Sequence, residues 1–106
     1  MRTLNFIVEG QIIKPSPSCD FANLVPGTEG YLQAKFAFSS EWNGCTKVVE
    51  FRSKGIEREP QLLTNGETCA IPAKALKSKT FTIRVIGKNN DLKLTTNRLT
   101  ITQNGG

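Results

Sequence analysis

An alternation of apolar and polar side chains over residues 31–38 constrains the fold of this chain more than any other feature. The apolar parity consists of Leu32, Ala34, Phe36 and Phe38. The opposite parity is mixed and consists of Tyr31, Gln33, Lys35 and Ala37. A period of two with a single apolar face is typical of a strand that buries one side. We therefore expect an all-β domain built from half-buried strands.

Turn-forming residues interrupt this strand at 39–44, and they include Trp42, the only tryptophan of the chain. Extended character resumes over residues 46–53, so the pattern predicts two strands joined by a corner. We expect Trp42 to be a packed residue of this corner rather than a platform for a ligand.

Alternation predicts a first strand from Thr3 that continues past Gly10 to Lys14, with a bulge or bend at the glycine. A loop then runs over residues 15–29, and a loop of this length is usually functional or packed across an open end of the sheets. Further strands are expected over residues 57–64 (an edge strand, because it contains Pro60), 80–86 and 98–103.

Asn65-Gly66 is the clearest local signal, because this dipeptide readily adopts the two positive φ angles of a type I′ turn. It predicts a tight hairpin between residues 61–64 and 67–71. Residues 72–77 are the only helix-like segment, and they predict one short helical turn.

The last part of the chain changes parity. Leu92 and Leu94 have even numbers, whereas Leu99 and Ile101 have odd numbers. One regular strand cannot bury all four side chains on the same face. The pattern therefore predicts a bulge or turn near residues 95–97.

Together these segments predict an immunoglobulin-like antiparallel β-sandwich of seven to eight short strands over residues 1–103. A small β-barrel is the alternative architecture. Residues 104–106, Asn-Gly-Gly, are expected to form a flexible tail. A chain of 106 residues is long enough to fold around one core without disulfides or a metal.

The composition argues against an enzyme. The chain has no histidine, which removes the Ser-His-Asp and Cys-His triads and the commonest metal ligand. Its carboxylates are scattered singly along the chain. The three cysteines, Cys19, Cys45 and Cys69, match no zinc spacing and are odd in number. We expect no catalytic site, cofactor or metal, and also no membrane partner and no secretion by a signal peptide.

The charge is uneven, because all but one of the charged residues after residue 67 are basic. These basic residues could form one positive, partner-binding surface, and they are Lys74, Lys77, Lys79, Arg84, Lys88, Lys93 and Arg98. Nucleic acid is possible as a partner but is not favoured, because the one aromatic of this half, Phe81, has the parity of the core. Tyr31 is a further candidate, either as an anchor for a partner or as a cover for the second sheet.

Five segments taken in order resemble a family of small β-sandwich domains in phages and prophages of Gram-positive bacteria. They are GYLQAKFAFSSEWNG, TKVVEF, QLLTNGETCAIPAKAL, FTIRVIG and LTTNRLTIT, and they cover most of residues 30–102. Members of this family resemble the amino-terminal attachment domains of virion fibres and baseplate proteins.

The resemblance implies a non-enzymatic virion structural protein of a capsid, neck or tail, in several copies and in contact with other phage structural proteins. The alternative is a phage-encoded inhibitor of a host defence protein. We expect no coiled coil or receptor-binding segment after the domain, so both alternatives stay open. The expected location is the virion, or the host cytoplasm during infection.

Overall fold

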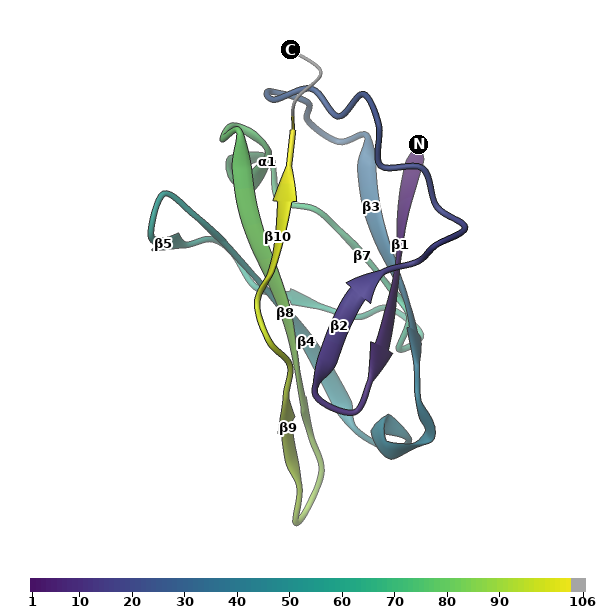
Figure 1. Cartoon of the computed structure of the whole chain (residues 1–106). Helices are drawn as coiled ribbons and strands as arrows, with labels where there is room; N and C mark the ends of the chain where they lie inside the picture. Colours follow the sequence, from purple (N-terminus) through teal and green to yellow (C-terminus); the bar gives the residue numbers. More distant parts are fainter. Residues whose placement is uncertain (104–106) are drawn as a thin grey trace.

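A computed structural model describes residues 1–103, and in it two β-sheets face each other across a shared core (Figure 1). Sheet A contains, in spatial order, β2 (Ile12–Pro15), β1 (Arg2–Glu9), β3 (Leu32–Phe38) and β7 (Thr68–Ala70). Sheet B contains β10 (Leu99–Thr102), β8 (Thr80–Lys88), β4 (Thr46–Ser53) and β5 (Ile56–Glu57). In addition, β6 (Gln61–Leu62) pairs with β4, and β9 (Lys93–Thr95) pairs with β8.

The predicted all-β sandwich is confirmed, and the described chain does not close into a barrel. It has ten strands rather than seven or eight, because several predicted strands are divided. The edge strand, for example, is divided at Glu59-Pro60 into β5 and β6. The prediction of purely antiparallel pairing is wrong at one place: β1 and β3 are parallel, with Phe6 opposite Phe36.

Alternate residues of both sheets form the core, as the parity predicted. Sheet A contributes the fully buried side chains of Leu4, Phe6, Val8, Ala34 and Phe36. Sheet B contributes those of Val49, Phe51, Phe81, Ile83 and Val85. These side chains leave the opposite parity of each strand on the two outer faces of the sandwich.

The corner between β3 and β4 is a short 3₁₀ turn, η1 (Ser40–Trp42), and it packs Trp42 into the core. The indole Nε1–H of Trp42 donates a 2.8 Å hydrogen bond to the carbonyl of Gly10. Its ring lies so close to Gly87 of β8 that a Cβ at that position would be 2.6 Å from a ring carbon. The predicted packing role of Trp42 is therefore confirmed.

The sequence predicted a continuous strand with a bulge or bend at Gly10, and this prediction is wrong. Instead, the chain reverses at Gly10, whose φ is 57°, and β2 returns antiparallel along β1 with Val8 opposite Ile13. A glycine with positive φ makes this two-residue reversal possible.

The Asn65-Gly66 turn is present, with φ angles of 53° and 71°. The predicted tight hairpin around it is wrong. Within residues 61–71 a single bridge, between Thr64 and Thr68, joins the two arms, after which β6 pairs with β4 and β7 pairs with β3. The two arms separate because each finds a longer strand to pair with, one in each sheet.

The long loop after β2 packs across one end of the sandwich, close to the amino terminus and to the end of β10 (Figure 1). Leu24 is buried in the core, and the ring of Phe21 packs edge-on against Phe6. The guanidinium of Arg2 donates to the carbonyls of residues 20, 22 and 23. The expectation that the loop closes an open end is therefore confirmed.

The predicted helical turn is also present, as α1 (Ala73–Leu76), which lies at the same end (Figure 1). Leu76 is fully buried, and its carbonyl accepts hydrogen bonds from Gly27 and from the side chain of Gln103. Across residues 1–103, the chain contains no helix that is long and apolar enough to span a membrane.

Candidate interaction face

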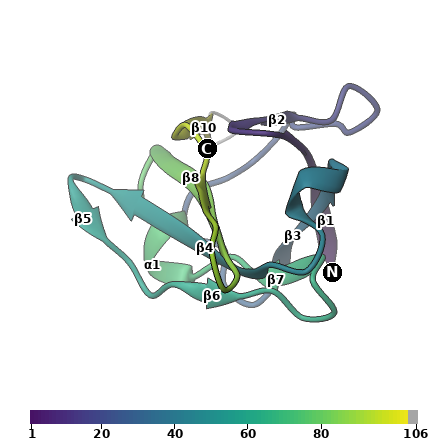
Figure 2. The ribbon, with the colours of Figure 1, turned by 90° about the horizontal axis from the view of Figure 1, so that it is seen from below.

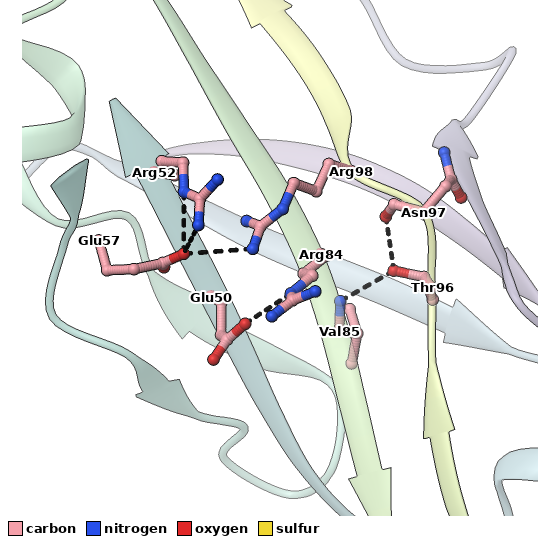
Figure 3. Close-up of polar contacts among 8 residues, drawn as sticks. All are labelled: Glu50, Arg52, Glu57, Arg84, Val85, Thr96, Asn97 and Arg98. Carbon is pink, nitrogen blue, oxygen red and sulfur yellow. Dashed lines mark hydrogen bonds and ion pairs between the residues drawn. The ribbon is translucent and has the colours of Figure 1, made fainter. Parts of the chain in front are cut away.

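The outer face of sheet B carries a network of charged side chains (Figure 3). Arg84 on β8 donates from Nε to Glu50 on β4 at 2.6 Å. Glu57 on β5 uses one oxygen, Oε1, for two arginines. It accepts from Arg52 at 2.8 Å and from Arg98 at 3.2 Å. Three arginines and two glutamates from four segments of the chain thus meet on one face, which leaves an excess of one positive charge.

Strand register explains how these residues meet. Glu50 lies directly opposite Arg84 in the β4–β8 pair, and Arg52 lies opposite Glu57 in the β4–β5 pair. Opposite charges at directly facing positions stabilise a sheet by a few tenths of a kcal/mol to about 1 kcal/mol. Both carboxylates lie on the β4–β5 side of this face, whereas Arg84 and Arg98 lie on the β8–β10 side.

Beside the charges lies a row of apolar side chains on the same face. Val48 of β4 pairs with Leu62 on one side and with Ile86 on the other, two residues along from the Glu50–Arg84 pair. Val48 and Ile86 are half-buried, and Leu62 is 65% exposed. Apolar side chains next to arginines are typical of protein–protein contacts. We name this surface the sheet B face; its principal residues are Val48, Glu50, Arg52, Glu57, Leu62, Thr82, Arg84, Ile86 and Arg98.

Two buried polar atoms of the sheet B face are unpaired. Within residues 1–103, neither Arg98 Nη1 nor Thr82 Oγ1 has a hydrogen-bond partner. A buried polar group without a partner costs about 1–3 kcal/mol. Both atoms are shielded from solvent within the fold, so they lower the stability of the chain and are not accessible to a partner.

The seven basic residues predicted as one surface are divided among three places. Lys74, Lys77 and Lys79 lie in and after α1, at one end of β8. Lys88 and Lys93 face each other at the other end of β8, about 30 Å away at the ordinary strand rise. Between the two ends lie Arg84 and Arg98, each in an ion pair.

The side chain of Tyr31 is exposed, as its interpretation as an anchor for a partner requires. Half of its surface is accessible, and the apolar side chains of Met1 and Val25 are exposed as well. Tyr31 borders a 180 Å³ cavity that is also lined by Arg2 and Leu24. It follows the loop that leads into sheet A, so it is not part of the sheet B face.

Sequence reasoning missed a groove of about 480 Å³ between β5 and α1. Ile56 lines it and is 54% exposed, although it pairs with the buried Ser53 and so points toward the inner side of sheet B. Figure 2 shows β5 projecting beyond the rest of the sandwich, which leaves this inward-facing position uncovered.

Sequence reasoning also missed the acidic partners in the network, Glu50 and Glu57. Their strands were predicted, but which strands are neighbours and in what register depends on the topology. An available signal was the parity of Glu50, which is opposite to that of Phe51 and so places it on an outer face.

Across residues 1–103, no group of three histidine, cysteine, aspartate or glutamate side chains is arranged to hold a metal ion. No protein-family model, no curated protein and no solved structure matches this chain.

Proposed function

We propose that this chain is a non-enzymatic structural protein of a phage virion that acts by assembling with other proteins of the particle, as a capsid, neck or tail component. The observation that supports this proposal best is the sheet B face, which joins an apolar row to a network of charged side chains. The five-segment resemblance to phage β-sandwich domains supplies the virion setting.

The chemistry of the sheet B face supports binding rather than catalysis. Glu50 and Glu57 each hold an arginine, so neither is positioned as a free general base. The exposed apolar row would instead gain about 25 cal/mol for each Å² that a partner removes from water. A folded partner that covers Val48, Leu62 and Ile86 would make use of that gain.

Direct nucleic-acid binding fits the arrangement less well. Arg84 and Arg98 already contact carboxylates, and the lysines lie at opposite ends of β8. A phosphate backbone is bound by a continuous positive surface rather than by separate groups.

Mass spectrometry of gradient-purified particles tests the proposal. The particles would come from the phage or induced prophage that encodes this chain. Recovery in a fixed ratio to the known particle proteins would support a virion role. Abundance in the infected-cell lysate together with absence from particles would overturn it and would favour the host-directed inhibitor.

A matched pair of variants links the result to the sheet B face. Ile86→Glu places a charge in the apolar row, and we expect it to reduce incorporation into particles. Lys35→Glu changes an exposed residue on the outer face of sheet A, and we expect normal incorporation. Equal incorporation of both variants would show that the sheet B face is not the contact.

A further inference from the structure

The sheet B face is complementary to itself. The β4–β5 side carries both carboxylates, and the β8–β10 side carries two of the three arginines. The cross-strand pairs Glu50–Arg84 and Val48–Ile86 place unlike charges and like apolar groups at equivalent positions on β4 and β8. A rotation that exchanges these two strands therefore brings each group opposite a suitable partner.

From this symmetry we propose that the sheet B face is the interface of a two-fold dimer, whose axis runs between β4 and β8 and nearly parallel to them. In this arrangement Glu50 of each copy lies across from Arg84 of the other copy, and Val48 lies across from Ile86. The β10 side, which carries Arg98, lies over the β5 side of the other copy, which carries Glu57. An isologous contact of this kind requires one patch that pairs with itself.

The network has free groups for such contacts. Every described contact of Glu50 and Glu57 uses Oε1, which leaves the second oxygen of each carboxylate available. A guanidinium has five N–H donors, and Arg84 uses one of them toward Glu50. The other donors can reach the free oxygens of a second copy while the contacts within each chain persist.

The dimensions of the face are suited to a second copy. The six strands of sheet B, with a rise of about 3.3 Å per residue and a spacing of about 4.8 Å, give about 450 Å² per copy in projection. Standard interfaces bury about 800 Å² per partner, and side-chain relief adds to the projected area. Face-to-face sheets pack with their strands about 30° apart, which needs only a small tilt of the axis and keeps the central pairs in contact.

This inference concerns the partner of the face named in the proposed function, and it is tested on the purified chain alone. Sedimentation velocity over a range of concentrations should show a monomer–dimer equilibrium of the native chain. Glu50→Arg and Arg84→Glu each place like charges opposite one another at two symmetric contacts. We expect each variant to raise the dissociation constant about 100-fold. Lys35→Glu, on the other sheet, should leave the dissociation constant unchanged.

Mixing the two defective variants gives the sharpest test. A Glu50→Arg chain presents two arginines and an Arg84→Glu chain presents two glutamates, so the mixture should form a heterodimer at concentrations at which each variant alone is monomeric. Circular dichroism of each variant checks that it is folded. A native chain that remains monomeric up to about 1 mM would overturn the inference, and so would a dimer that neither substitution weakens.

Failure of this inference and failure of the proposed function are distinguishable. A monomeric chain that is nevertheless found in purified particles would reject the dimer and keep the virion role. A dimer that depends on Glu50 and Arg84 but is absent from particles would support the dimer and reject the virion role.

Discussion

The side-chain oxygen of Asn97 accepts a 2.8 Å hydrogen bond from the backbone N–H of Ile13, and this contact joins the two sheets along one side of the sandwich. The backbone N–H of Asn97 also donates to the carbonyl of Gln11 at 3.1 Å. Ile13 belongs to β2 at the edge of sheet A, and Asn97 lies between β9 and β10 at the edge of sheet B. Pairing the edge of β2 in this way protects it from other strands.

Asn97→Ala should lower the free energy of unfolding by about 1 kcal/mol, because the N–H of Ile13 loses its acceptor. Urea denaturation measures the loss, and hydrogen exchange at Ile13 shows whether it is local. Asn97→Asp keeps an acceptor and serves as the control. An alanine variant with native stability and a protected Ile13 amide would show that this contact contributes little.

Thr96→Val should be more destabilising, by about 1–3 kcal/mol. The hydroxyl oxygen of the buried Thr96 accepts a 3.0 Å hydrogen bond from the backbone N–H of Val85. Valine at position 96 would leave that N–H buried and unpaired. Thr96→Ser retains the hydroxyl and should recover most of the stability. Thermal unfolding of the three proteins provides the comparison, and equal loss in the serine and valine variants would contradict the role of the hydroxyl.

These two residues show how far the sequence predicts this part of the fold. The change of parity after Leu94 predicted a break near residues 95–97, and the break is there, between β9 and β10. The change of parity could not predict that the hydroxyl of Thr96 would accept a hydrogen bond from the backbone N–H of Val85, or that Asn97 would contact β2. Those contacts depend on which strands are neighbours in space.

Gly87→Ala should destabilise the chain by about 1–3 kcal/mol, because the added Cβ would overlap the ring of Trp42. The fluorescence of Trp42, the only tryptophan, should change as its ring moves. In the background of Trp42→Phe, which has a smaller ring, the same alanine should cost less. Additive effects of the two substitutions would mean that the strain lies elsewhere.

Burial raises the pKa of the Cys69 thiol from 9.0 to about 12. The unfolded chain therefore loses this proton at lower pH than the folded chain, so stability falls as pH rises from about 9 to 12. The slope from this group approaches about 1.4 kcal/mol per pH unit. Denaturation at several pH values should show a smaller decline for Cys69→Ala than for the native chain. Parallel declines would exclude Cys69 as the source.

The strands with long alternation were predictable from sequence, because the burial of one face fixes their parity whatever their neighbours are. Pairing was less predictable. Asn65-Gly66 predicted the turn but not the partners of its arms, because β6 and β7 pair with longer strands of different sheets. The sheet B face depends on pairing in the same way, since Glu50 meets Arg84 only through the register of β4 and β8.

The parallel pairing of β1 with β3 also has a consequence for the order of folding. The β1–β2 hairpin needs only neighbouring residues, so it can form as soon as that part of the chain is free. The central pairing of Phe6 with Phe36 must instead wait for the whole intervening loop to close, and such closure slows folding. During synthesis, the inner face of β1 therefore stays open to solvent until the chain as far as Phe38 has left the ribosome, and this is the period in which the nascent chain most needs protection from aggregation.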